Sequence, residues 1–335
     1  MKYRILICVS LIVIVLAMAN LFASHAQQVD AQLTGNGGPP LSNPLKVALL
    51  KWYNANRVPT GFPVGAGPLG VAFDGANIWV AAGIGATKLR ASDGQNLGTF
   101  AAGNGGTGVT FDGANIWVSN SSDNTVTKLR ASDGKNLGAF PVPGVFPWWM
   151  AFDGANIWVP SSNASGNGWV TKLRASDGQN LGNFTVGNSP TAVAFDGVNV
   201  WVTNGGGNSG GTVTKLRADD GTVVGTFAVG NGPLGIAFDG ANMWIANLGG
   251  SSVTKLRASD GTVLGTFGTP PSPYGVAFDG ANIWVTGAPD MYELRASDGA
   301  VLGRFSPPHT NTTGVAFDGA NIWVAGYNTN KIGKL

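Results

Sequence analysis

Short hydrophobic runs alternate with polar turns along most of the chain, from about residue 57 onward. A typical stretch reads GVAFDGANIWVAN, then TVTKLRASDG, then LGTF. The runs are rich in Val, Ile, Phe, Trp and Thr and are separated by Asp-Gly, Gly-Asn or Pro, which is typical of β-strands joined by tight turns. The high glycine density disfavours helical repeats. The pattern predicts four short strands in each unit and no helix within it.

This unit is repeated. The Asp of FDGANIWV, or of a close variant, lies at positions 74, 112, 153, 196, 239, 279 and 318, at spacings of 38 to 43 residues, which makes seven copies. One four-stranded sheet cannot bury both of its faces alone, whereas sheets stacked around a common axis can. We therefore predict an all-β, seven-bladed β-propeller with four antiparallel strands in each blade.

One end of the repeat region lacks a strand that the other end can supply. Leu335 lies 12 residues after Trp323, as a residue of a third strand would, so the last copy lacks a fourth strand. The segment PTGFPVG precedes the first copy, and its Phe62 lies 11 residues before Phe73, the spacing found at other junctions. We predict that this N-terminal segment supplies the missing strand of the C-terminal blade and closes the ring.

Constant and variable spacings distinguish the two faces of the predicted ring. Phe of the first strand precedes Trp of the second by six residues in all seven copies, whereas Trp to the third-strand Leu varies from 10 to 15 residues. Because strands alternate in direction, the variable loop between strands two and three shares a face with the connection to the next blade. We call this the variable face, and we expect function there.

The N-terminal region predicts separate segments. Lys2 and Arg4 precede an apolar stretch from Ile5 to Ala19, and a small-residue pattern ends at Ala26, which indicates a signal peptide over 1–26; an uncleaved membrane anchor is the alternative. We assign 27–43 to a flexible leader, 44–56 to a short helix and linker, and 57–335 to the propeller. Such a chain is expected to be secreted, periplasmic or on the cell surface, and monomeric.

Composition narrows the classes of partner. Of the 335 residues only 11% are charged, and removal of Lys2 and Arg4 leaves 18 basic against 18 acidic residues. No basic footprint for nucleic acid is present. The single Cys8 lies in the signal segment, so packing rather than disulfides must hold the fold.

The repeated polar motifs have structural explanations. Asp-Gly pairs at hairpin turns suit backbone hydrogen bonding better than calcium binding. The Trp at one position of every second strand suits packing between blades. Lys and Arg of KLR are expected to pair with Asp on the outer wall.

The unit GVAFDGANIWVAN, TVTKLRASDG, LGTF resembles the YVTN-type β-propeller repeat, whose signature is nearly spelled by VWVTN at 200–204. It is also similar to the wider group that includes NHL-type repeats and streptogramin (virginiamycin B) lyases. The resemblance implies a seven-bladed propeller, often secreted, with functions from lyase to binding scaffold. Such a lyase is expected to use His and an acidic group with a divalent metal.

Side chains that commonly act in catalysis are scarce in this sequence. Beyond the signal segment the chain holds one His, His309, one Glu, Glu293, and no Cys. Asp123 and Asp290 are the only Asp in variable loops, so acid-base and metal-assisted chemistry are poorly supplied. We predict no catalytic residues, metal site or cofactor.

Aromatic side chains outside the repeat pattern are the candidate site. Three Trp in the third copy could gather at one edge of a central mouth, where exposed aromatics often mark binding sites. The ligand-binding residues that we predict on the variable face are Trp148, Trp149, Trp169, Tyr274, His309, Thr191 and Thr313. The sequence favours a non-enzymatic module that binds a protein, peptide or carbohydrate; a streptogramin-lyase-like or lactonase-type enzyme and a structural cell-surface protein are the alternatives.

Overall fold

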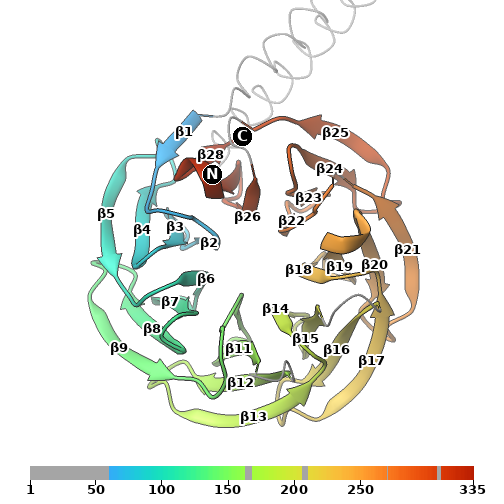
Figure 1. The fold of residues 1–335 in the computed structure, drawn as a ribbon, viewed down its shortest axis with the longest axis horizontal. Helices are drawn as coiled ribbons and strands as arrows, with labels where there is room; N and C mark the ends of the chain where they lie inside the picture. Colours follow the sequence, from blue (N-terminus) through green and yellow to red (C-terminus); the bar gives the residue numbers. More distant parts are fainter. Residues whose placement is uncertain (1–59, 163–167, 206–209, 270, 308–310) are drawn as a thin grey trace, which may run out of the picture. The chain divides into compact units, whose positions relative to one another are not determined.

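Seven four-stranded antiparallel sheets surround a central axis in the computed structural model (Figure 1). The structure describes residues 60–162, 168–205, 210–269, 271–307 and 311–335. The predicted β-propeller is confirmed, and each sheet is one blade. The predicted signal peptide, leader and short helix lie outside the described residues. Within the described ranges, no helix has the length and hydropathy needed to span a membrane.

The strands run outward from the axis in each blade. Blades 1 to 3 are β2 (Val71–Phe73), β3 (Asn77–Ala82), β4 (Gly85–Arg90), β5 (Asn96–Ala101); β6 (Gly106–Phe111), β7 (Asn115–Asn120), β8 (Thr125–Arg130), β9 (Asn136–Pro141); and β10 (Ala151–Phe152), β11 (Asn156–Ser162), β12 (Gly168–Arg174), β13 (Asn180–Val186). Blades 4 and 5 are β14 (Pro190–Phe195), β15 (Asn199–Asn204), β16 (Gly211–Arg217), β17 (Val223–Val229); and β18 (Pro233–Phe238), β19 (Asn242–Asn247), β20 (Ser252–Arg257), β21 (Val263–Gly268). Blades 6 and 7 are β22 (Val276–Phe278), β23 (Asn282–Val285), β24 (Met291–Arg295), β25 (Val301–Phe305); and β26 (Thr312–Phe317), β27 (Ile322–Gly326), β28 (Lys331–Lys334), β1 (Thr60–Pro63). Two short 3-10 helices, η1 (Leu248–Gly250) and η2 (Tyr327–Thr329), lie between the second and third strands of blades 5 and 7.

The ring closes as predicted. β1 pairs antiparallel with β28, with Phe62 opposite Ile332, so both ends of the repeat region build blade 7. The Phe62 ring packs on Trp323, with centroids 5.6 Å apart. No open strand edge is therefore left between the first and last blades.

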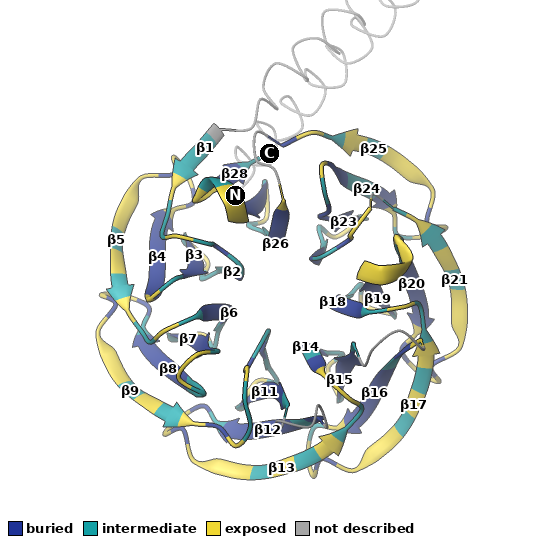
Figure 2. Ribbon diagram, viewed as in Figure 1, coloured by how far each residue is buried: buried dark blue, intermediate teal, exposed yellow. Residues whose placement is uncertain are grey.

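The core lies between blades. Second and third strands are almost wholly buried, while the outermost strands expose every second residue to solvent (Figure 2). The Trp of the second strands are the largest buried side chains, and each packs on the fourth-strand Phe of its blade at 5.1–5.6 Å between centroids. The prediction that these Trp serve blade packing is confirmed.

Every repeat Trp is held by the Asp of its own FDG turn. In blade 2 the Trp117 indole N–H donates to Asp112 Oδ2 at 2.8 Å, while Asp112 Oδ1 accepts the backbone N–H groups of Ala114 and Asn115. The same bonds recur in all seven blades, with Trp-to-Asp distances of 2.7–2.8 Å. Burial alone would raise the pKa of such a carboxyl, but at Asp74, Asp196, Asp239 and Asp318 these donors hold the pKa below its ordinary value.

The lysines of KLR were expected on the outer wall beside Asp, and this prediction was wrong. Lys128 is 6% exposed; its Nζ lies 5.2 Å from the centroid of the Trp117 ring and donates to the Ala175 and Ser176 carbonyls of blade 3 at 2.6 and 3.0 Å. Five more lysines bridge to the next blade in this way: Lys88, Lys172, Lys215, Lys255 and Lys334. Only the arginines form the predicted surface pairs with Asp.

The turn after KLR, whose carbonyls accept the lysine of the preceding blade, also contacts the fourth-strand Phe of that preceding blade. Gly134, in the turn after KLR of blade 2, has φ +73°, and a Cβ there would overlap the ring of Phe100 from blade 1. Glycine is required on both grounds. One turn thus accepts an ammonium group and an aromatic ring from the neighbouring blade.

The junction between blades 6 and 7 is the exception. The third and fourth strands of blade 7 come from opposite ends of the repeat region, so no turn connects them. At this junction Glu293 replaces the lysine and accepts a 2.9 Å hydrogen bond from Asn282 Nδ2. Within the described residues, the lysine is therefore replaced at the one junction where no turn follows the third strand of the next blade.

We expect the Trp–Asp bond to be measurable in blade 2. Trp117→Ala should cost about 3–5 kcal/mol because it opens a cavity between blades. Trp117→Phe keeps an aromatic ring but removes the indole donor from Asp112 Oδ2, which keeps only the Asn115 side-chain amide, and should cost about 1–3 kcal/mol. Urea denaturation measures both, and an unchanged midpoint in the Ala variant would contradict the assignment.

The lysine bridge has a matched control on the same blade. Lys128→Met removes two hydrogen bonds to carbonyls from a charged donor and should lower the free energy of unfolding by about 1.5–3 kcal/mol. Lys135→Met lies in an exposed turn and should stay within about 0.5 kcal/mol of wild type. Equal effects of the two substitutions in denaturant titrations would refute a specific bridge.

Candidate functional site

The variable face has almost no charge. In its connections and second-to-third-strand loops, Asp123 and Asp290 are the only residues of the Asp, Glu, Lys and Arg types. Asp123 accepts the Asn104 backbone N–H at 2.7 Å and the Asn104 side-chain amide at 3.0 Å, which lowers its pKa. Asp290 is bonded to Ser306 and paired with Arg304, and these contacts lower its pKa.

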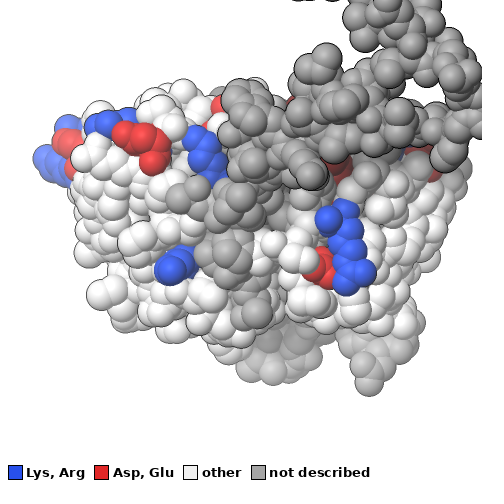
Figure 3. Space-filling model, turned by 90° about the horizontal axis from the view of Figure 1, so that it is seen from above, with Lys and Arg blue, Asp and Glu red and all other residues white. Residues whose placement is uncertain are grey.

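Charge gathers elsewhere on the molecule. The Arg–Asp pairs lie in the turns between third and fourth strands, which strand direction places on the face opposite the variable one. In the side view of Figure 3, most charged side chains lie along one rim, next to partners of opposite sign, and the wall is mainly uncharged. A ligand of the variable face would thus meet amide, hydroxyl and aromatic groups.

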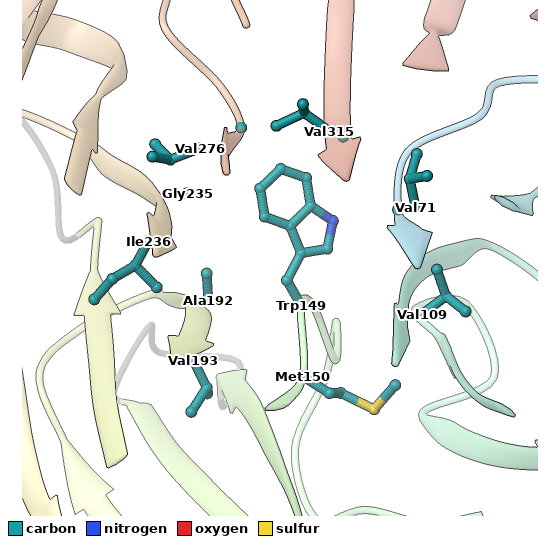
Figure 4. A pocket seen from close by; sticks show the side chains of 13 residues that line it. Val71, Val109, Trp149, Met150, Ala192, Val193, Gly235, Ile236, Val276 and Val315 are labelled. Atoms are coloured by element: carbon teal, nitrogen blue, oxygen red, sulfur yellow. The ribbon is translucent and has the colours of Figure 1, made fainter. Parts of the chain in front are cut away.

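One residue occupies the central channel. Three residues before the first-strand Phe, the blades carry Gly70, Gly108, Trp149, Ala192, Gly235, Gly275 and Gly314. A Cβ at Gly314 would overlap the Leu69 carbonyl oxygen of the next blade. The first strand of blade 3, β10, has only two residues, Ala151 and Phe152, and Trp149 lies outside it. Trp149 forms an isolated parallel β-bridge with Ala192 of blade 4. Its side chain points into the channel (Figure 4).

Trp149 reaches across the channel to blade 6. Its ring lies 5.4 Å from the Tyr274 ring at an interplanar angle of 72°, an edge-to-face contact. The Trp149 Nε1 donates to the Thr107 carbonyl of blade 2 at 3.1 Å, and its backbone N–H donates to the Thr191 carbonyl of blade 4 at 3.1 Å. Trp149 therefore narrows the channel and connects blade 3 to three other blades.

A small cavity remains beside the Trp149 ring. Its volume is about 130 Å³. Aliphatic side chains and glycine peptide groups share its wall, to which every blade contributes: Gly70, Val71, Val109, Met150, Ala192, Val193, Gly235, Ile236, Gly275, Val276, Gly314 and Val315. The wall holds no titratable side chain, so it offers apolar contact and neutral hydrogen bonding.

Seven carbonyls surround the mouth of this channel, four residues before each first-strand Phe. Six of them already accept a hydrogen bond: Thr107 from Trp149 Nε1, Trp148 from Ser119 Oγ, Thr191 from Trp149 N, Leu234 from Thr203 Oγ1, Tyr274 from Gly235 N and Thr313 from Thr286 Oγ1. The described residues also gather no group of three His, Cys, Asp or Glu.

Tyr274 is the one tyrosine at these seven positions, and its ring contacts Trp149. Burial, followed by the nearby Tyr327, raises the pKa of Tyr274 to about 12, so the hydroxyl stays neutral. Among the described residues, no hydrogen bond uses this hydroxyl. Tyr327 in η2 is 42% exposed. The sequence analysis missed Tyr327, although it is the only aromatic residue in the second-to-third-strand loops.

The other predicted site residues have separate positions. Trp169 donates from Nε1 to the Pro143 carbonyl at 2.6 Å within its own blade, and Trp148 is half-buried. The Thr191 and Thr313 hydroxyls donate to the Pro233 and Pro68 carbonyls of neighbouring blades. His309 lies outside the described residues. Of the predicted set, the structure brings together Trp149 and Tyr274 through their rings, and Thr191 through its carbonyl.

Comparison with known proteins shows the fold alone. No protein-family model matches the chain, and no curated protein matches it significantly. Among solved structures, a hydrazine synthase chain from Kuenenia stuttgartiensis is 17% identical with a TM-score of 0.69, over 80% of this chain and 95% of that one. Virginiamycin B lyase from Staphylococcus aureus is 18% identical with a TM-score of 0.68, over 82% and 98%. A streptogramin B lyase structure is 19% identical with a TM-score of 0.66, over 82% and 96%.

We expect Trp149→Gly, which introduces the residue found at this position in five other blades, to keep the fold and open the channel. Loss of the half-buried ring should cost about 2–4 kcal/mol. Indole should then raise the melting temperature of the variant by several degrees, because it refills the space, and should leave wild type unchanged. Equal stabilisation of both proteins by indole would contradict a channel filled by Trp149.

Proposed function

We propose that this chain is an exported, non-enzymatic binding module of the YVTN-type repeat group, and that its variable face recognises a ligand or partner. The observation that carries the proposal is the half-buried Trp149–Tyr274 pair beside a cavity whose wall holds no charged side chain. Aromatic groups that remain partly exposed at a concave site are typical of binding surfaces.

The use of the polar residues supports binding rather than catalysis. Asp of the FDG turns hold Trp, lysines bridge blades, and arginines pair with turn Asp. On the variable face, Asp123 is bonded to Asn104 and Asp290 to Arg304. A general acid or base must reach a substrate proton, and these carboxylates are already engaged.

Enzymatic function is the second candidate, because two of the similar structures are lyases for streptogramins. Identities under 20% leave activity undecided, since one propeller fold carries unrelated functions. Lyase activity would require His309 with carboxylates near the mouth, whereas a binding module requires only the aromatic site.

A thermal-shift screen of the full chain separates these functions. The probes are sugars, neutral peptides, lactones, a streptogramin and divalent metal ions, because a ligand of the folded state raises the melting temperature. We expect a shift that Trp149→Gly abolishes and Trp169→Thr retains, since Thr occupies the equivalent of Trp169 in blades 2 and 4. Metal-dependent turnover of the streptogramin or a lactone would overturn the proposal.

A further inference from the structure

The mouth is unfavourable for anionic ligands. Its described loops offer Asn, Ser, Thr and Gly groups, and the two carboxylates among them are already bonded to Asn104 and Arg304. A phosphate, sulfate or carboxylate placed here would lose hydration without gaining a cationic partner. Neutral molecules do not carry this cost.

The cavity selects for a single ring. Its volume of about 130 Å³ is close to the roughly 150 Å³ that holds one benzene-sized molecule. Valine and isoleucine side chains cover part of the wall, and peptide groups of Gly70, Gly235 and Gly275 cover another part. These peptide groups already have partners: Gly70 O accepts from Ala81 N, Gly235 N donates to Tyr274 O, and Gly275 N donates to Thr286 Oγ1. A carbonyl oxygen such as that of Gly70 keeps a second lone pair, so a ring with both C–H faces and hydroxyl groups matches the wall better than a purely apolar ring.

The aromatic pair favours a saccharide among neutral rings. The faces of Trp149 and Tyr274 carry negative π charge, which attracts the polarised C–H groups on the apolar face of a pyranose. Near them, the neutral Tyr274 hydroxyl can donate to a sugar oxygen, supported by its pKa of about 12.

A bound peptide is less favoured by the backbone at the mouth. Extended peptides commonly pair with an open strand edge. Here six of the seven carbonyls at the mouth already accept hydrogen bonds, including those of Thr107, Thr191 and Tyr274. Side-chain amides and hydroxyls remain, which suits the scattered hydroxyl groups of a sugar.

We propose, on the basis of the proposed function, that the mouth beside Trp149 and Tyr274 binds the terminal ring of an uncharged glycan. The apolar face of the ring packs on the Trp149 ring, and its hydroxyl groups bond to the Tyr274 hydroxyl and to the second lone pair of the Gly70 carbonyl oxygen. Tyr327, exposed at the rim, contacts the next sugar of the chain.

The test is an array of immobilised neutral, sialylated and sulfated glycans, probed with the full chain. Retained glycans are then titrated calorimetrically with three variants: Trp149→Gly, Tyr274→Leu and Trp169→Thr. Leu occupies the Tyr274 position in blades 1 and 5, as Leu69 and Leu234, so this variant should fold. We expect binding of neutral glycans only, at least tenfold weaker in the first two variants and unchanged in Trp169→Thr.

Each other outcome is decisive. Retention of sialylated or sulfated glycans alone, or no retention of neutral ones, overturns the carbohydrate inference. If a neutral peptide in the thermal-shift screen instead gives a shift that Trp149→Gly abolishes, the proposed function stands and only the ligand class is wrong. Glycan binding that is as tight in Trp149→Gly and Tyr274→Leu as in wild type would place the sugar elsewhere and overturn the site.

Discussion

The hydrogen bond from each buried indole to its FDG carboxylate is the constraint on which the ring depends. It fixes the Trp ring in the gap between blades, and the lysine of the same blade lies above that ring while donating to carbonyls of the next blade. The Asp, Trp and Lys side chains thus connect the FDG turn, the core between the blades and the neighbouring blade. Because the bonds recur around the ring, blade spacing is set by one repeated geometry, and the seven FDG Asp are committed to structure.

Ring closure breaks this repetition at one place. The third and fourth strands of blade 7, β28 and β1, come from opposite ends of the repeat region, so among the described residues no turn joins them as it does in the other blades. At the junction with blade 6, Glu293 with Asn282 replaces the lysine. On the other side of blade 7, Lys334 and Phe62 contact the Ala91 carbonyl and Gly94 of blade 1, as in every other junction. The closing blade is therefore regular toward blade 1 and altered toward blade 6.

Much of this architecture could be predicted from the sequence because it follows from local spacing. The six residues from Phe73 to Trp79 specify a hairpin, and seven such hairpins specify a ring. The lysine positions could not be predicted in this way. Lys128 and Arg130 share one side of a strand, and only the neighbouring blade's carbonyls determine which of them is buried. The contact between Trp149 and Tyr274 is also non-local, since it requires blades 3 and 6 to face each other across the channel.

The division between the two faces explains why a binding site can arise from so few changes. Charged groups stabilise the face with the constant turns, so substitutions there disturb bridges between blades. In the described part of the variable face, Asp290 with Arg304 is the one ion pair, and the connections between blades differ in content. A single aromatic residue in a ring of small ones, Trp149, narrows the axial channel and adds an aromatic ring to the lining of its cavity. Because the surrounding groups are neutral, the specificity of that site depends on shape, stacking and hydroxyl contacts rather than on charge.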